Sequence, residues 1–209
     1  MSDDIVDFNK KFFYSQFVNA IEGDWVAGEI EAASAVYYSR NDGDYNTPAT
    51  WSKLGFNGPA SATAPNKLSD RVRIQDHSIT VSGATALASL IALENGTDGR
   101  QPGKLTITGS NYLQGDTVRI EQNTTFSIGH PDGIEFAQAA TGAVRSNVRN
   151  FDQNAIYEYS GTVSQITGTA LPSIVKCVRV VKPAGIPLIL SLNVAISDSL
   201  VINEGVLDI

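Results

Sequence analysis

Apolar residues alternate with polar ones near the carboxyl end of the chain. In the stretch LILSLNVAISDSLVINEGVLDI (188–209) they occupy every second position from Leu188 to Ile196, and again at Leu200 and Ile202. A period of two is typical of a β-strand that buries one face. Two short polar runs interrupt the pattern with Ser, Asp, Asn and Gly, residues that favour sharp bends. The pattern therefore predicts short strands joined by tight corners.

The same short unit recurs through the middle of the chain. Each occurrence is a pair of apolar residues two positions apart, bounded by Gly, Asn, Asp or Ser. The pairs are Val72/Ile74, Ile79/Val81, Leu105/Ile107, Val118/Ile120 and Phe126/Ile128. Such short units favour an all-β protein, a parallel β-helix or β-solenoid whose stacked coils bury alternate residues. A β-sandwich is the alternative, and Asn-Gly at 57–58 and 95–96 would support it through two-residue hairpins.

The amino-terminal segment does not show this pattern of short strands and tight corners. Apolar residues of 4–22 fall close to one helical face, which predicts a helix; a strand around 13–17 is the competing interpretation. Either would act as a packing or capping segment. The domain prediction is accordingly such a segment over 1–36 and a β-solenoid module over 37–209. Because the chain stops within an apparent strand, we expect a fragment of a longer protein.

Two further stretches lack a clear period. Residues 37–69 are rich in Gly, Pro, Asn, Ser and Thr, which predicts a long ordered loop or a pair of short strands. Residues 129–150 predict loops with a short strand at 134–136. The turn-forming residues of 94–103 predict an exposed loop.

Composition narrows the classes of partner. The 209 residues include fifteen Lys and Arg against 22 Asp and Glu, a net charge of −7. Scattered basic residues in an acidic chain argue against nucleic acid and against an anionic membrane surface. No run of about twenty apolar residues is present, so we expect no membrane insertion. The single cysteine, Cys177, can form no internal disulfide, and we expect it to fill the core.

Two stretches carry a family resemblance. One is Tyr37 to Val81, with YYSRNDGDYNTPATWS before GPASATAPNKLSDRVRIQDHSITVSG; the other is FDQNAIYEYSGTVSQITGTALP (151–172) with the strands that follow. Together they resemble a module of large secreted cell-surface proteins of Bacteroidetes. The chain has Tyr45 where that family usually carries Trp, a conservative departure.

The resemblance implies a fold, a route of export from the cell and a final location. It implies a parallel β-helix or β-solenoid, exported by type IX secretion to the cell surface or the extracellular space, in an adhesin-like or filament-forming protein. The implied partners are the secretion machinery and neighbouring repeats of a longer chain. A whole member would also carry a signal peptide and a sorting domain, and their absence here agrees with the fragment interpretation.

No set of residues assembles into a catalytic motif. His77 and His130 are the only histidines, and neither lies in a metal-ligand spacing. A nucleophile elbow, a phosphate-binding loop and a dinucleotide fingerprint are all missing from the sequence. We therefore expect a non-enzymatic protein without a cofactor, calcium being the one candidate ion.

The calcium candidate is the loop around Asp42, Asp44 and Asn46. Oxygen-bearing side chains at alternate positions match the spacing from which a loop wraps Ca²⁺. The EF-hand pattern fails, because Thr47 replaces its glycine and Lys53 its bidentate glutamate. A turn with side-chain-to-backbone hydrogen bonds is therefore the favoured interpretation.

Other candidate sites involve aromatic and hydroxyl side chains. Tyr45 and Trp51 could belong to an exposed aromatic platform that stacks on surface glycans, although Trp51 as a plug that fills the open end of the coil is the favoured interpretation. Thr117 and Ser199 each follow an aspartate and precede an apolar residue. That order matches the short O-glycosylation acceptor pattern of Bacteroidetes.

These observations lead to one functional prediction and two alternatives. We predict a non-enzymatic structural or adhesive module of a secreted bacterial surface protein, with contacts made by the loops at 41–66 and 94–103. The first alternative is a carbohydrate-binding or carbohydrate-active β-helix domain. The second is a passive fragment of secretion cargo.

Overall fold

The computed structural model describes residues 6–7, 12–13, 34–97, 99–136 and 140–209. The chain divides into two units, Met1–Ala33 and Ser34–Ile209. In the first, β1 (Val6–Asp7) pairs antiparallel with β2 (Phe12–Phe13). These four residues are in strands, so the helix predicted over 4–22 is wrong there; its other residues, and most of the competing strand around 13–17, lie outside the described residues.

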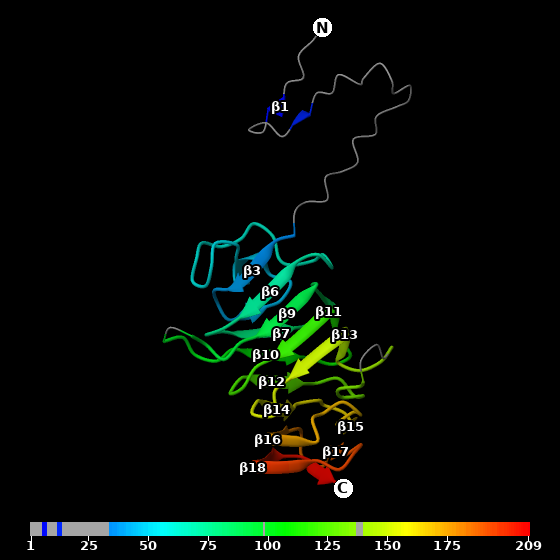
Figure 1. Ribbon diagram of the computed structural model, residues 1–209. Coiled ribbons are helices and arrows are strands. Elements are labelled where there is room, and N and C mark those ends of the chain that lie inside the picture. The colour runs from blue at the N-terminus through cyan, green and yellow to red at the C-terminus, as the bar shows by residue number, and fades with distance from the viewer. Residues whose placement is uncertain (1–5, 8–11, 14–33, 98, 137–139) are drawn as a thin grey trace, which may run out of the picture. The chain divides into compact units, whose positions relative to one another are not determined.

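The regular secondary structure of the second unit is almost all β and forms three sheets, with a short 3-10 helix at Pro48–Thr50 (Figure 1). In spatial order the first sheet contains β4 (Gly43–Asp44), β7 (Ser78–Val81), β10 (Lys104–Ile107), β12 (Thr125–Ile128), β14 (Ile156–Tyr159), β16 (Ile174–Val181) and β18 (Ala195–Glu204). The second sheet contains β5 (Trp51–Ser52), β3 (Val36–Ser39), β6 (Arg71–Ile74), β9 (Leu90–Leu93), β11 (Leu113–Ile120) and β13 (Val144–Phe151), with β8 (Ala86–Leu87) also on β11. The third sheet contains β15 (Gln165–Ile166), β17 (Pro187–Ile189) and β19 (Val206–Asp208).

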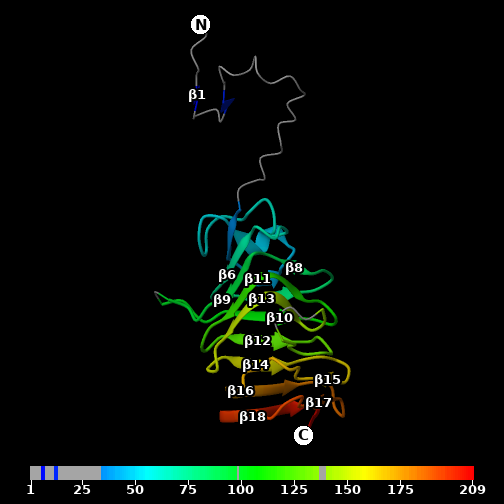
Figure 2. The same cartoon turned by 45° about the vertical axis from the view of Figure 1, so that its right-hand side comes forward.

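The chain alternates between sheets. From β6 to β14 the chain passes in turn through a strand of the second sheet and a strand of the first, except that the short β8 directly precedes β9 within the second sheet. Strands that are neighbours in one sheet are therefore separated along the chain by a strand of the other sheet (Figure 2). All pairs in the first and third sheets are parallel. In the second unit the described strands form one antiparallel pair, β3 with β5. Neither Asn-Gly site forms a hairpin, which removes the support they gave to a sandwich.

The register of the first sheet aligns its inward side chains in two columns. The first column is Ile79, Leu105, Phe126, Tyr157 and Val178, and the second is Val81, Ile107, Ile128, Tyr159 and Val180. None of these side chains is more than 2% exposed. The strands predicted from alternating apolar pairs are therefore present, and the alternate residues form the core as expected.

Two segments differ from the prediction. Residues 134–136 form no strand, whereas 144–151 form β13, an eight-residue strand that the sequence analysis missed. Its sequence, VRSNVRNF, lacks a period of two, and parallel pairing with β11 holds it extended instead. The alternation from 188 to 196 belongs to two strands, because β17 ends at Ile189 and β18 begins at Ala195.

A buried carboxylate connects three neighbouring strands of the second sheet. Glu94, at the end of β9, is 3% exposed. It accepts bonds from Arg73 Nε at 2.8 Å and Nη2 at 3.0 Å, from Gln75 Nε2 at 2.7 Å, and from Arg119 Nη2 at 3.0 Å. Both oxygens are thus satisfied by donors from β6, β11 and the corner after β6. The hydrogen bonds to Glu94 raise the pKa of Arg73, so this guanidinium stays charged.

Replacing Glu94 by Ala should lower the free energy of unfolding by about 3 kcal/mol, because two guanidinium groups and an amide lose their shared acceptor. Urea denaturation monitored by circular dichroism measures this loss. Asp116→Ala is the control, since the Asp116 carboxylate is exposed and accepts one bond, from Asn147. Equal effects of the two substitutions would contradict a structural role for Glu94.

Candidate functional site

The two aromatic residues predicted as a glycan platform lie inside the core. Tyr45 and Trp51 have no exposed area, and their rings meet edge-on with centroids 5.4 Å apart. Trp51 Nε1 donates to the carbonyl oxygen of Tyr45 at 2.7 Å, and the Tyr45 hydroxyl donates to the carbonyl of Leu87 at 2.9 Å. Burial raises the pKa of Tyr45 well above its usual value. Neither ring offers a face to a sugar, and Trp51 fills the core as the favoured interpretation had it.

Two of the three calcium candidates, Asp42 and Asp44, are used as hydrogen-bond acceptors. Asp44 Oδ1 accepts the backbone N–H of Asn46 at 2.8 Å, and Asp44 Oδ2 accepts from Ser82. Asp42 Oδ1 accepts the N–H of Ser78 at 2.8 Å. The first contact is the side-chain-to-backbone turn expected from the sequence. The other two fasten this loop to both ends of β7, and calcium binding stays a prediction.

The two predicted glycosylation residues lie on strands. Thr117 belongs to β11, and its backbone N–H donates to the carbonyl of Ser89 at 2.9 Å. Ser199 belongs to β18. Both are partly buried, and their modification stays a prediction.

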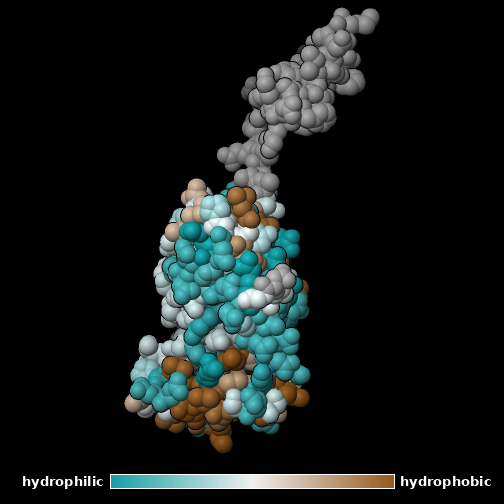
Figure 3. All heavy atoms as spheres, turned by 90° about the vertical axis from the view of Figure 1, so that its left-hand side faces the viewer, coloured by the Kyte–Doolittle hydropathy of each residue, from teal (hydrophilic) through white to brown (hydrophobic). Residues whose placement is uncertain are grey.

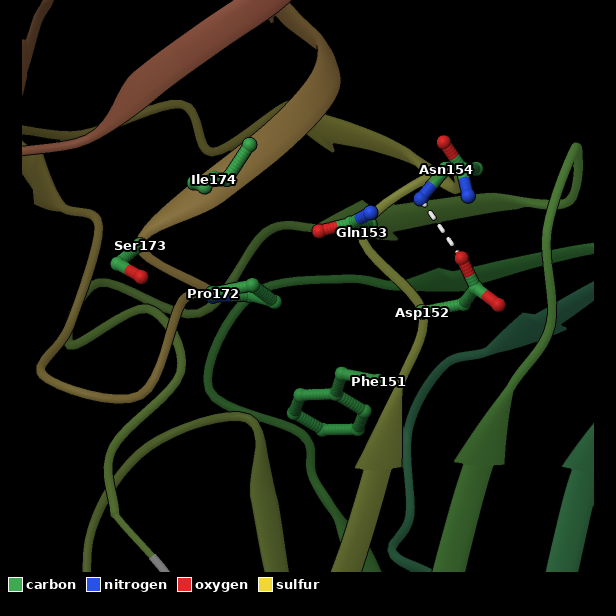
Figure 4. A pocket seen from close by; sticks show the side chains of 7 residues that line it. All are labelled: Phe151, Asp152, Gln153, Asn154, Pro172, Ser173 and Ile174. Atoms are coloured by element: carbon green, nitrogen blue, oxygen red, sulfur yellow. Dashed lines mark hydrogen bonds between the residues drawn. The ribbon is translucent and has the colours of Figure 1, made fainter.

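A hollow of about 470 Å³ lies where the second sheet ends. One wall is the end of β13 and the corner that follows, with Phe151 and Asp152–Asn154; the other is the segment Pro172–Ile174 that leads into β16 (Figure 4). A smaller hollow of about 280 Å³ adjoins it and shares Phe151 and Asp152. Among the strands that the structure describes, none pairs with the far edge of β13, and the hollow lies beside this edge.

Hydrogen bonds between side chains and the backbone hold the corner of the hollow in place. Asp152 Oδ1 accepts the N–H of Asn154 at 2.7 Å, and the Asp152 carbonyl accepts the hydroxyl of Tyr157 at 2.8 Å. Burial raises the pKa of Tyr157, so its hydroxyl remains a donor. Phe151 is supported by Phe126, whose ring centroid lies 6.2 Å away. The site is therefore organised before any ligand arrives.

The lining of the hollow favours a neutral polar ligand. Phe151 offers an aromatic surface, Asp152 keeps one carboxylate oxygen without a hydrogen bond among the described residues, and the side-chain amides of Gln153 and Asn154 are exposed and equally without one. Glu121 on the adjoining side adds a second carboxylate, whose charge is shared with Arg119 Nε at 3.2 Å. Carboxylates disfavour an anion, whereas an aromatic face beside carboxylate and amide groups suits a sugar.

The sequence analysis missed these residues. FDQN at 151–154 was recognised as part of a familiar stretch, but no pattern in it marks a ligand site. The hollow depends on where the second sheet stops, which is a tertiary feature. The only local signal was the group of Asp, Gln and Asn after Phe151.

Comparison with known proteins gives no relative: no family model, curated protein or solved structure matches the chain. In the part of the chain that the structure describes, no helix has the length and hydrophobicity to cross a bilayer.

Replacing Trp51 by Ala should lower the free energy of unfolding by about 3–5 kcal/mol, because it empties a fully buried volume and removes the contact with Tyr45. Thermal and urea unfolding measure the change. Leu54→Ala is the control, since Leu54 is 80% exposed and should change stability by less than about 0.5 kcal/mol. A fully stable Trp51 variant would contradict the buried position.

Proposed function

We propose that residues 34–209 form a parallel β-solenoid that serves as a non-enzymatic structural or adhesive module of a secreted bacterial surface protein. The observation that carries the proposal is the register of the first sheet, in which two unbroken columns of buried side chains run across five successive parallel strands. Coils stacked in this way form a stiff rod, since each adds about 4.8 Å along a continuous set of backbone hydrogen bonds.

The opposite face of the same sheet, where Ser127 and Glu158 are also buried, supports a scaffold role. Between the two core columns lies a third column, of Thr80, Thr106, Ser127, Glu158 and Arg179. Glu158 is ion-paired with Lys104 Nζ at 2.9 Å, across the intervening strand β12. This pair spans three strands, which suits a structural contact. Export by type IX secretion and placement at the cell surface rest on the resemblance described above.

Adhesion is tested by displaying the chain on bacterial cells through an unrelated anchor and measuring retention of the cells on surfaces under flow. An adhesive module should retain several times more cells than the anchor alone. Shortening the loops within 53–64 and 95–101, which leaves the buried Glu94 in place, should reduce retention without unfolding the chain. Retention equal to that of the anchor alone would overturn adhesion and support passive cargo.

We propose saccharide binding at the hollow beside Phe151 as a second candidate function. The specific observation that favours it is a preorganised corner that combines an aromatic surface, a carboxylate and two exposed amides. The buried Tyr45 and Trp51 take no part in it. Sugar rings stack their apolar faces on aromatic rings, while planar carboxylate and amide groups bond adjacent hydroxyls.

A glycan array, probed with and without calcium, tests this site. We expect saturable binding that weakens at least about tenfold in Phe151→Ala and Asp152→Asn, a loss of about 1.4 kcal/mol or more. Phe136→Ala is the matched control, because Phe136 is an exposed phenylalanine outside the hollow. Binding that survives both substitutions would place the sugar elsewhere, and no binding under either condition would overturn the candidate.

A further inference from the structure

The chain contains two Asn-Gly pairs, and the structure places them in different surroundings. Asn57–Gly58 and Asn95–Gly96 both lie in corners outside the strands. An asparagine before glycine is prone to cyclise, because glycine has no side chain to hinder the approach of its backbone nitrogen to the asparagine carboxamide. The two pairs therefore form an internal comparison, in which one dipeptide is held in two local structures.

The turn at 55–58 is restrained against this reaction. The backbone N–H of Gly58 donates to the carbonyl oxygen of Gly55 at 3.2 Å, and the carbonyl oxygen of Gly58 accepts Arg40 Nε at 2.8 Å. A Cβ on Gly58 would lie 2.4 Å from Ser52 Oγ, so the turn is also closely packed. Attack by the Gly58 nitrogen would break its hydrogen bond and disturb this packing.

The corner that follows β9 leaves Gly96 without such a restraint. The backbone N–H of Gly96 has no hydrogen-bond acceptor among the described residues. The loop is closed at its base by a bond from the N–H of Gly103 to the carbonyl oxygen of Glu94 at 3.0 Å, which Gly96 does not share. Gly96 has a φ of +83°, which glycine adopts without strain. Its nitrogen can therefore turn toward the side chain of Asn95 without giving up a hydrogen bond.

The carboxamide of Asn95 is polarised for attack. Its Oδ1 accepts Asn123 Nδ2 at 3.2 Å, and Asn123 Oδ1 accepts Lys176 Nζ at 3.4 Å. This series of donors begins at an ammonium group, so it stabilises the negative charge that develops on Asn95 Oδ1 during attack. Figure 3 shows mostly hydrophilic side chains on the side of the second unit from which this corner projects, so water reaches it.

We propose that Asn95 is a site of spontaneous covalent modification, in which the Gly96 nitrogen cyclises onto its carboxamide and water opens the ring. The Gly96 nitrogen loses its proton to solvent base and bonds to Asn95 Cγ. The Cγ–Nδ2 bond breaks, and the nitrogen leaves as ammonia with a proton returned by the solvent. One water molecule then adds to either carbonyl of the succinimide, which gives aspartate or isoaspartate.

The product differs in charge and in backbone. The new carboxylate makes the chain one unit more negative than its net charge of −7. The N–H of Asn95 donates to Glu121 Oε2 at 3.1 Å, so the new carboxylate arises close to an existing one, and the two repel. Isoaspartate also lengthens the backbone by one carbon, where a Cβ on Gly96 would already lie 2.4 Å from the carbonyl oxygen of Arg100. We therefore expect the corner to loosen.

Peptide mapping by mass spectrometry tests the site on the full 209-residue chain, aged in mildly alkaline buffer. We expect Asn95 to react about tenfold faster than Asn57, because the Gly58 nitrogen must first break its hydrogen bond. In urea the two pairs should react at similar rates, since both are then without structure. Equal rates in the folded chain, or no product at Asn95 while the chain in urea reacts, would overturn the proposal.

Asn123→Gly tests the polarisation of the carboxamide. Asn123 has a φ of +62°, which glycine tolerates, so the variant removes the amide donor and keeps the backbone. The rate at Asn95 should fall about threefold, whereas the rate at Asn57, followed in the same sample, should stay the same. An unchanged rate at Asn95 would overturn the role of Asn123.

Cleavage by trypsin after Arg100 reports the loosening of the corner. In the unmodified chain Arg100 Nη1 is paired with Asp76 Oδ2 at 3.0 Å. The aged chain should be cut there faster than the fresh chain. Asn95→Gln is the control, because its longer side chain does not close the five-membered ring, and equal cleavage of the two aged chains would contradict the loosening. The inference stands apart from the proposed function, since the reaction needs neither adhesion nor a saccharide.

Discussion

The structure depends on one constraint, the alignment of inward apolar side chains across parallel strands. In the first sheet each inward residue is covered above and below by its counterparts in neighbouring strands, and this leaves the two columns almost without exposed area. Parallel register fixes the alignment, because a slip by one residue would turn every apolar side chain outward. Buried polar contacts such as those of Glu94 and Lys182 then satisfy the groups that the corners bring inside.

The constraint is relaxed where the second sheet ends. One inward column of this sheet consists of Tyr37, Val72, Ile91, Val118 and, on the edge strand β13, Arg149. Arg149 Nη2 donates to the carbonyl oxygen of Val144, and burial lowers the pKa of Arg149 to about 10. The neighbouring inward column, Ile74, Leu93 and Ile120, ends in Phe151, so both columns reach β13, which is the edge strand of this sheet among the described residues. The hollow beside Phe151 lies at that edge.

The sequence predicted the part of the fold that local pattern determines. The pairs from Val72/Ile74 to Phe126/Ile128 were found because one buried face imposes a period of two. β13 was missed because tertiary pairing with β11 holds it, and the hollow because it depends on where a sheet stops. For Trp51 the sequence favoured a plug over a ligand site but kept both open, since a sequence does not reveal which aromatic rings are covered.

The edge strands at the two ends of the second unit differ in length and in how far their apolar neighbours are buried. At one end the edge strands are two residues long and fully buried aromatic residues lie beside them, which removes both the template and the apolar surface. At the other end a ten-residue edge keeps Leu200 and Ile202 half exposed. Fully burying such a side chain contributes about 1.5–3 kcal/mol, so Leu200 and Ile202 contribute less to stability than the fully covered residues of the same two columns.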